Sequence, residues 1–364
     1  MKVLTLGGAM MDTIAIIDAN RIERMTMANA DASFLLLAEG QKTEASEVSR
    51  HTGGGAINAA VGLARLGADV SVIAKLGQDE RAETIIQRLM SEGVSPRWLS
   101  RDGTEPTGAS VMVSSHDRNA AIFTFRGANT LLTPADLKAD AFAVDLVYVA
   151  GLSNKSADCF PDIVAMAKAH DAFVCANPGI RQLSRNPQAS LELLKDIDLF
   201  AVNATEAGAL VPALVETCGE GGALLEATDD RPLPGLAARG LFGGGFHLAL
   251  AAYFRAMADL GVRYAVISDG TDGAWLGCDG HLFHCPTAPV EVAGTAGAGD
   301  AFLSTLSHEL VDGRAPDDAL RAATLNAASV VTFVDTQSGL LSRAQLDARV
   351  DIGAGALQVR DWRH

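Results

Sequence analysis

The segment best suited to chemistry spans residues 290–300 and reads VEVAGTAGAGD. An apolar stretch with helical spacing follows it, which places the glycines at the start of a helix. There, successive backbone N–H groups can point into one concavity, and the helix dipole adds to their positive field. The pattern predicts an anion cradle with Asp300 at its mouth, where a carboxylate is suited to accept a proton from a hydroxyl. A first-turn Asp that only stabilises the helix is the alternative.

A second glycine run, residues 53–55, also leads into a helical pattern and places Asn58 on the first turn of that helix. Glycines permit close backbone approach to a ligand, and an Asn amide can both donate to and accept from a hydroxyl. The same residues would equally form a tight strand-to-helix turn with Asn58 as a local cap.

A third segment follows the strand-like run LFAV and begins with Asn203, with Glu206 three residues later. This spacing puts an amide and a carboxylate on one face of a helix. Hard oxygen ligands of this kind suit Mg²⁺ that is held largely through water. An ordinary helix start has the same signature, so both interpretations stay open.

The elements that must position these segments alternate between strands and helices. Short apolar, β-rich runs predict buried strands at residues 2–6, 70–74, 146–150, 173–176, 199–202 and 264–268. Helical patterns, three of them closed by a glycine, occupy residues 56–66, 81–92, 160–170 and 246–260. Such alternation predicts an α/β fold with a mostly parallel central sheet covered by helices on both faces. Ligands of such sheets bind at the carboxyl ends of the strands.

Two kinds of region interrupt the alternation. Parts of residues 13–50 and 107–126 could form a small β-sheet that acts as a lid, because their strand-like runs lack an independent core. Residues 212–245 are rich in Gly, Pro and Ala and predict an irregular surface excursion.

Composition excludes several classes of partner. The chain has 364 residues, with 29 Lys and Arg against 44 Asp and Glu, and a formal net charge of −15. A field of that sign repels nucleic acids and anionic membranes, and few basic residues flank the motifs, which argues against an already phosphorylated substrate. No secretory signal or long apolar span is evident, and the five cysteines lack a paired spacing, so we expect a cytoplasmic protein with free thiols.

Other catalytic signatures are missing from the sequence. It has no GxxxxGK[ST] loop, no GxSxG elbow and no HExxH helix, and its opening GGAMMD lacks the GxGxxG spacing of dinucleotide-binding units. The cluster Cys278, His281, His284 and Cys285 has a spacing that suggests zinc. However, Asp279-Gly280 favours a hairpin turn, after which His281 and His284 would face opposite sides of a strand.

In combination, these segments resemble the ribokinase-like (PfkB) family of carbohydrate kinases. The resemblance rests on GGGAINAAVGLARLG at residues 53–67, NATE at residues 203–206 and GTAGAGDAF at residues 294–302, in this order and at these distances. GAN at residues 127–129 and the pair Asn177-Pro178 add to it, and it runs through most of the chain. It implies a single kinase domain over residues 1–364, with ATP and Mg²⁺ as the nucleotide and metal.

The resemblance also implies roles for individual residues. Asp300 would deprotonate the hydroxyl of a small unphosphorylated sugar, ribose-like, ketose or sugar acid. The backbone of the cradle would hold the transferring phosphoryl group, and the two N-terminal segments would hold the sugar. The cradle residues are Gly297, Ala298 and Gly299, and the sugar-binding residues are Asp12, Gly54, Gly55 and Asn58.

For the nucleotide, the resemblance assigns a magnesium site and an adenine pocket. Asn203 and Glu206 would position Mg²⁺ and its waters, with Glu206 acting through water. Ser268, Gly270 and Gly273 belong to a turn against the nucleotide, and Asn326 would flank the adenine. Family members also imply a homodimer formed through the lid.

Three departures from the family pattern qualify these expectations. Gly294-Thr295-Ala296 replaces the usual Asp-Thr-Thr, which predicts weak dependence on K⁺. Gly55 stands where a lysine is found in ribose-specific members, and the stretch from 206 to 264 is longer than usual. The alternatives are a nucleoside kinase of the same family, with Phe34, Phe123 or Phe125 as a platform for the base, and a noncatalytic sugar or nucleotide sensor.

Overall fold

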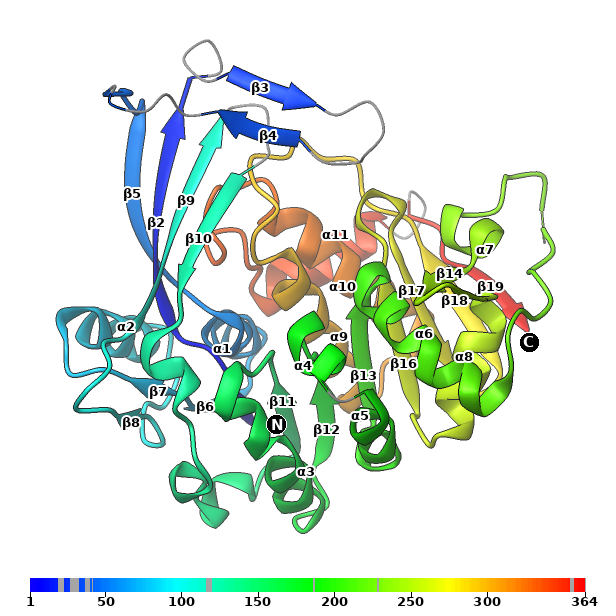
Figure 1. Cartoon of the computed structure of the whole chain (residues 1–364), viewed down its shortest axis with the longest axis horizontal. Coiled ribbons are helices and arrows are strands. Elements are labelled where there is room, and N and C mark those ends of the chain that lie inside the picture. Colours follow the sequence, from blue (N-terminus) through cyan, green and yellow to red (C-terminus); the bar gives the residue numbers. More distant parts are fainter. Residues whose placement is uncertain are drawn as a thin grey trace.

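A nine-stranded sheet forms the centre of the computed structural model, which describes residues 1–18, 23–26, 33–36, 40, 42–115, 120–185, 187–227, 229–353 and 357–363. The strand order is β19-β18-β17-β16-β13-β12-β11-β1-β6 (Figure 1). Neighbours from β16 to β6 pair in parallel, and β16 to β19 pair antiparallel. The strands are β1 (Lys2–Leu6), β6 (Asp69–Ile73), β11 (Leu146–Val149), β12 (Phe173–Ala176), β13 (Leu199–Asn203), β16 (Tyr264–Ser268), β17 (Ala274–Cys278), β18 (His281–Cys285) and β19 (Arg360–Arg363).

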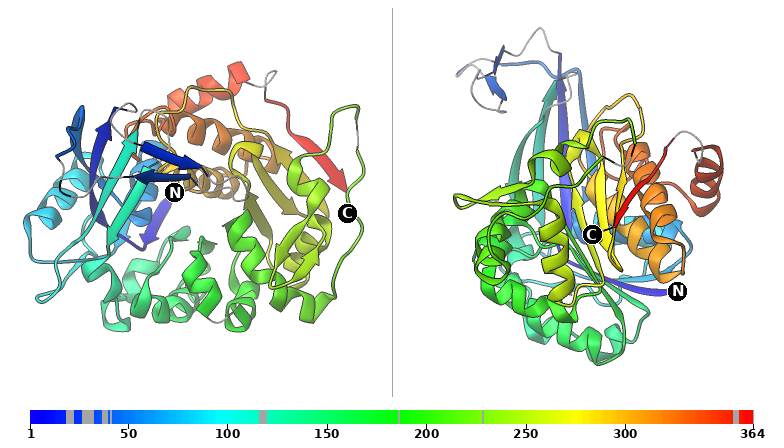
Figure 2. Two further views of the ribbon diagram at one scale, coloured as in Figure 1. Left: turned by 45° about the horizontal axis from the view of Figure 1, so that its top comes forward. Right: turned by 90° about the vertical axis from the view of Figure 1, so that its right-hand side faces the viewer.

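Helices cover both faces of this sheet (Figure 2), which confirms the predicted three-layer α/β architecture. One layer contains α3 (Phe160–Lys168), α4 (Ile180–Arg185), α5 (Pro187–Leu193), α6 (Ala204–Cys218), α7 (Gly235–Arg239) and α8 (Leu250–Asp259). The other layer contains α1 (Gly55–Arg65), α2 (Glu80–Ser91), α9 (Ala298–Val311), α10 (Pro316–Val330) and, packed on α10, α11 (Arg343–Gly353). Because strand side chains alternate, Leu4 and Leu6 belong to the first core and Val3 belongs to the second.

Glycines end the helices where the sequence predicts. Gly67, Gly93 and Gly261 follow α1, α2 and α8 with φ of 95°, 76° and 95°. Residues other than glycine rarely adopt this left-handed backbone conformation, so these glycines end the helices at defined positions. Asp79 fixes the start of α2, because its carboxylate accepts the N–H of Ala82 at 3.0 Å.

A four-stranded side sheet rises from one end of the central sheet, with the order β10-β9-β2-β5 (Figure 1). It contains β2 (Met10–Ile17), β5 (Glu47–Gly53), β9 (Gly108–Ser115) and β10 (Ala120–Phe125). Ile14, Ile16 and Met112 are buried on its inner face. Two strand pairs lie apart from it: β3 (Glu23–Thr26) with β4 (Ser33–Leu36), and β7 (Lys75–Leu76) with β8 (Ser100–Arg101).

The stretch from 212 to 260 differs from the expectation in two places. Helix α6 runs on to Cys218, so the irregular excursion is shorter than predicted. The pair Gly244-Gly245, with φ of 58° and 88°, turns the chain between β14 (Leu241–Gly243) and β15 (Phe246–Leu248), and helix α8 begins only at Leu250. A two-glycine turn is a strong hairpin signal that the helical pattern of residues 246–260 had masked.

Pro212 lies inside α6, where it removes one helical hydrogen bond. Proline has no N–H for the carbonyl of Gly208 to accept. That carbonyl packs directly against Gly243 of β14, where a Cβ atom would lie 1.8 Å from the oxygen. None of the described helices is long and apolar enough to cross a membrane, and all five cysteines are free thiols.

Candidate active site

The anion cradle stands at the amino terminus of α9. Gly297 caps the helix with φ of 81°, and a Cβ atom there would lie 2.7 Å from Cβ of Thr336, so conformation and space both require glycine. The first helical hydrogen bond runs from the N–H of Ala301 to the carbonyl of Gly297, at 2.9 Å. The preceding amides, those of Ala298, Gly299 and Asp300, therefore have no acceptor within the helix.

The carboxylate of Asp300 lies mostly buried at the mouth of this cradle. Nδ2 of Asn58 donates to its Oδ2 at 2.8 Å. Burial raises the pKa of Asp300, the bond from Asn58 lowers it, and the negative charge of Asp12 raises it further. A carboxylate with a raised pKa and no paired cation is suited to accept a proton.

Asn58 uses most of its amide within the protein, which leaves the second hydrogen on Nδ2 as a donor for the sugar. Its Oδ1 accepts from Oγ1 of Thr336 at 2.9 Å and from Nε2 of Gln337 at 3.2 Å. Gln337 is in turn anchored, because Nε2 also donates to the carbonyl of Thr52 at 2.9 Å. Thr336 and Gln337 were missed by the sequence analysis, and they fix the amide that orients the candidate base.

Asp12 lies on β2 with 5% of its surface exposed, and it accepts a hydrogen bond from Ser110 of β9. Burial raises the pKa of Asp12. Gly53 and Gly54 permit this arrangement. A Cβ atom on Gly53 would lie 1.9 Å from Oδ2 of Asp12, and one on Gly54, whose φ is 96°, would lie 2.4 Å from the carbonyl of Gly8.

Gly55 is the last residue of the glycine run at residues 53–55 and lies close to the candidate base Asp300. A Cβ atom at this position would lie 2.8 Å from Cβ of Ala150 and 3.4 Å from Oδ1 of Asp300. Helix α1 thus begins directly beside the candidate base and the carboxyl end of β11. The structure therefore brings together Asp12, Gly54, Gly55, Asn58 and Asp300, which are far apart in the sequence.

Asn203 and Glu206 cap α6 reciprocally. The N–H of Glu206 donates to Oδ1 of Asn203, and the N–H of Asn203 donates to Oε2 of Glu206, both at 2.9 Å. Glu206 also accepts from the N–H of Ile180, and burial raises its pKa. A partly buried carboxylate held in place without a cation fits water-mediated Mg²⁺, because a nearby cation would favour its charged form.

The remaining residues expected at the nucleotide differ in how exposed they are. Ser268 ends β16, Gly270 is open to solvent with φ of 55°, and a Cβ atom on Gly273 would lie 2.1 Å from the carbonyl of Cys285. The side chain of Asn326 is fully buried. It donates to Oγ1 of Thr305 at 2.7 Å and accepts from the N–H of Leu341 at 3.0 Å, so here it joins α10 to its neighbours.

Two of the three aromatic residues named for the nucleoside alternative, Phe123 and Phe125, are not on the inner face of the side sheet. Thr124, Ser110 and Asp12 are cross-strand partners, and Phe123 and Phe125 alternate with Thr124 to the outer face. They are 60% and 49% exposed. Phe34 lies in β4, and its side chain falls outside what the structure describes.

The suspected zinc cluster is a hairpin, as predicted. Strands β17 and β18 pair across Asp279-Gly280, His281 contacts the carboxylate of Asp361, and His284 contacts the carbonyl of Asp272 at 2.8 Å. Within the described part of the chain, no three or more His, Cys, Asp or Glu side chains gather where they could hold a metal ion.

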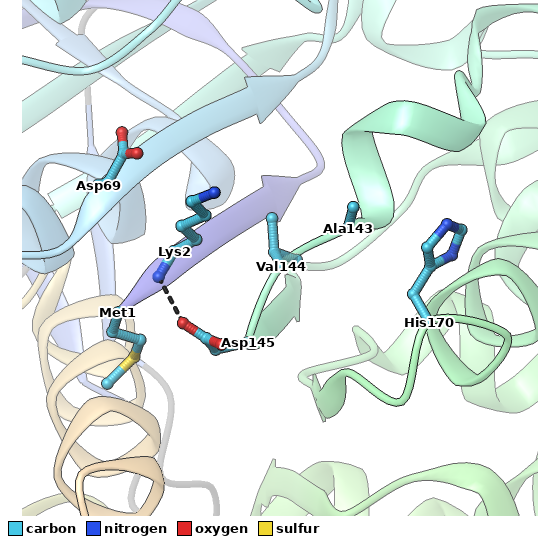
Figure 3. Close-up of a pocket in the computed structure, with 7 residues that line it drawn as sticks. All are labelled: Met1, Lys2, Asp69, Ala143, Val144, Asp145 and His170. Atoms are coloured by element: carbon cyan, nitrogen blue, oxygen red, sulfur yellow. Dashed lines mark hydrogen bonds between the residues drawn. The ribbon is translucent and has the colours of Figure 1, made fainter.

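A pocket of about 670 Å³ opens at the opposite end of the sheet (Figure 3). It lies by the start of β1 and β11, where the N–H of Lys2 donates to Asp145 at 2.7 Å. Parallel sheets bind ligands at the other ends of their strands, and no candidate residue lines this pocket, so it is separate from the site. Its lining residues are Met1, Lys2, Asp69, Ala143, Val144, Asp145 and His170.

Comparisons with known proteins show what the whole chain is similar to. A deoxyribokinase from Salmonella typhi is 26% identical over 341 residues, which cover 92% of this chain and 97% of the relative. A 5-dehydro-2-deoxygluconokinase from Bacillus velezensis is 26% identical over 298 residues, or 79% of this chain and 82% of the relative. The structure of Arabidopsis thaliana ribokinase complexed with ribose and ATP has a TM-score of 0.70 and 20% identity, covering 96% of this chain and 98% of that chain.

The sequence also matches the pfkB family carbohydrate kinase over residues 14–228 and 247–343. The gap in this match coincides with α7 and β14, in the stretch that the sequence analysis found longer than the family pattern. The chain therefore belongs to the pfkB family of carbohydrate kinases and is a sugar kinase with the ribokinase fold.

Proposed function

We propose that this sugar kinase transfers the γ-phosphoryl group of ATP to a hydroxyl of a small unphosphorylated sugar, with Asp300 as the base. The observation that carries the proposal is the position of Asp300. Its carboxylate has a raised pKa, is held by Asn58, and stands beside the free amides at the start of α9. This position supports the proposal, because a general base would then act next to an anion cradle.

The reaction would proceed by in-line displacement. The sugar hydroxyl forms a bond to the γ-phosphorus while the bond to the β-phosphate oxygen breaks and ADP leaves. Asp300 takes the hydroxyl proton as that bond forms. The amides of Gly297, Ala298 and Gly299 stabilise the negative charge on the transferring phosphoryl oxygens.

Asp12 would hold the sugar through its hydroxyl groups, supported by the buried position and by the bond from Ser110 that orients the carboxylate. Asp12→Ala should raise the KM for the sugar roughly 10- to 150-fold, because a charged hydrogen bond contributes about 1.5 to 3 kcal/mol. The KM for ATP should stay nearly unchanged. An equal rise in both constants would contradict this role.

The nucleotide would lie along the carboxyl ends of β13 and β16, against the turn that contains Ser268, Gly270 and Gly273. Asn203 and Glu206 would hold Mg²⁺ through water, and the ion would neutralise phosphate charge when bound. The capping bonds between these two residues support the assignment, because they fix the carboxylate in one orientation.

The outer face of the side sheet supports a homodimer. Val111, Phe123 and Phe125 are 44%, 60% and 49% exposed on neighbouring strands. Exposure of these apolar side chains to water is unfavourable, and packing against a second copy of the chain would remove it. Sedimentation should show a dimer at micromolar concentration, and a monomer would contradict the assignment.

A coupled ADP-release screen across pentoses, hexoses, ketodeoxy sugar acids and nucleosides tests the proposed function. Turnover of a sugar or sugar acid with ATP supports it. A preferred nucleoside would favour the nucleoside kinase, and nucleotide binding without turnover of any acceptor would favour a sensor.

A further inference from the structure

Two arginines beyond the strand ends are close enough to influence each other. Arg126 follows β10, and Arg181 lies in α4, shortly after β12. Burial and then the positive charge of Arg181 lower the pKa of Arg126. No described carboxylate forms an ion pair with either guanidinium, although most other arginines with printed contacts do pair and the chain has a net charge of −15.

Contacts place both arginines beside the chain that leaves β11. Nη1 of Arg126 donates to Oγ of Ser153 at 2.7 Å. The N–H of the preceding residue, Leu152, donates to Oε1 of Gln182 at 3.2 Å, next to Arg181 in the sequence. One short segment therefore contacts the side chain of Arg126 and the neighbour of Arg181.

The same segment leads directly to the candidate base. Ala150 lies against Gly55 at the position where Oδ1 of Asp300 is also close. Ser153 lies three positions after Ala150, and a chain of three residues spans roughly 11 Å at most. The segment that Arg126 contacts thus begins beside the carboxylate that would accept the proton.

Arg126 also adjoins the sugar-binding strands of the side sheet. Asp12, Ser110 and Thr124 are partners in register across β2, β9 and β10. Arg126 comes two residues after Thr124, where the chain leaves the sheet. Asp12 and Asp300 therefore supply the negative charge of the site, and Arg126, whose pKa the positive charge of Arg181 lowers, stands where β10 leaves the side sheet.

We infer that Arg126 and Arg181 bind the carboxylate of the substrate, so that the acceptor is a sugar acid and not a neutral sugar; this rests on the proposed kinase function. Paired guanidinium groups match the planar geometry and charge of a carboxylate, and their own repulsion is relieved when an anion binds between them. A phosphate shares this chemistry, but its second charge would be repelled by Asp12 and Asp300.

Substrate comparison with matched variants tests this inference. The probes are 5-dehydro-2-deoxygluconate and 2-dehydro-3-deoxygluconate as acids, 2-deoxyribose and ribose as neutral sugars, and ribose 5-phosphate. The variants are Arg126→Gln and Arg181→Gln. The control is Arg97→Gln, because Arg97 is an exposed arginine that stacks on Trp98 and forms no ion pair with a described residue.

We expect the parent to prefer one of the acids. Each of the two glutamine variants should raise the KM for that acid about 10- to 100-fold, with the KM for ATP and the turnover of neutral sugars unchanged. Arg97→Gln should behave like the parent. Arg181 is exposed, so Arg181→Gln keeps the test valid even if Arg126→Gln folds poorly.

The outcomes separate this inference from the proposed function. Preferred turnover of a neutral sugar, insensitive to both variants, would overturn the inference and leave the kinase intact. Preferred turnover of ribose 5-phosphate would overturn the carboxylate assignment. If no acceptor is turned over, the proposed function fails, and the thermal shift of the protein with each acid in the absence of ATP tests the inference separately. Stabilisation by an acid that both variants abolish would support the inference. The absence of any arginine-dependent shift would overturn the inference.

Discussion

Helix α9 carries two buried carboxylates in opposite environments. Asp300, in the first turn, accepts one hydrogen bond from a neutral amide and lies near a second negative charge, and its pKa is raised. Glu309, further along the same helix, is 1% exposed and lies 2.6 Å from both Nε of Arg314 and Nη2 of Arg343. Burial opposes ionisation of Glu309, but bonds from His308 and Arg343 and the charges of both arginines lower its pKa to about 2.

The difference between these carboxylates shows how the neighbouring charges set the pKa of each. The positive end of the helix dipole favours the charged form of Asp300, yet burial and Asp12 outweigh it. An arginine beside Asp300 would lower its pKa and weaken it as a base. Glu309 has such partners, so its charge stabilises the fold and is of little use for proton transfer.

The largest expected effect is on turnover. Asp300→Asn should reduce kcat by a factor on the order of 10² to 10⁴ or more, because the variant keeps the shape of the side chain and cannot accept the proton. Steady-state ADP release measures this. Binding of ATP should be retained.

The same variant should be more stable than the parent at neutral pH. The pKa of Asp300 is raised on folding, so the ionised carboxylate destabilises the native state as pH rises above the unfolded value of 3.8. Unfolding at pH 7 and well below pH 3.8 should show a gain only at the higher pH. A loss of stability at pH 7 would contradict the account of Asp300.

Glu309→Gln should have the opposite profile. At pH 7 it should lower the free energy of unfolding by about 3 to 5 kcal/mol, because Arg314 and Arg343 lose their buried partner. Glu309 contributes stability above its unfolded pKa of 4.5 and loses it as pH falls toward 2, so the deficit should shrink in that range. Denaturant unfolding checks this, and turnover of the folded variant should match the parent.

A smaller effect is expected for Asn58→Ala. The bond from Asn58 lowers the pKa of Asp300, so its removal should shift the acid limb of the kcat profile to higher pH. Turnover should fall roughly tenfold at neutral pH and partly recover as pH rises. Thr336→Val, which removes a donor to Asn58, should act in the same direction and more weakly. If the acid limb of the kcat profile of Asn58→Ala is not shifted, the amide of Asn58 does not set the pKa of Asp300.

The smallest effect is expected for K⁺. The loop that precedes the cradle has no carboxylate at Gly294, and the N–H groups of Ala293 and Gly294 both donate to the carbonyl of Val331, at 2.7 and 3.2 Å. A cation there would depend on carbonyl oxygens alone. Turnover in sodium, potassium and tetramethylammonium salts at equal ionic strength should differ only a few-fold. Large saturable activation by potassium would refute this.

Local patterns were sufficient to predict much of the fold. The strand runs at residues 2–6, 173–176 and 264–268 match β1, β12 and β16, because short apolar runs bounded by turn residues are local signals. The glycine run at residues 53–55 was also identified, although it accommodates Gly8 and Asp12 and not only a ligand. The hairpin of β14 and β15 was missed, because the apolar residues after Gly245 continue into a helical pattern.

The partners of the site residues could not be predicted from local patterns. Thr336 and Gln337 lie 278 and 279 residues from Asn58 in the sequence, and nothing in DTQSG suggests a bond to an amide there. Arg126 and Gln182, which follow β10 and β12, bond to neighbouring residues of the segment after β11. Contacts of this kind depend on the tertiary fold, which a single sequence does not specify locally.

Single-turnover phosphoryl transfer as a function of pH, in the parent and in Asp300→Asn with saturating ATP and acceptor, tests the assignment of the base most directly. We predict that the parent rate falls as pH drops below the raised pKa of Asp300, and that the variant is slow at every pH and lacks this limb. A variant that transfers the phosphoryl group at the parent rate, or that keeps the same limb, would contradict the assignment.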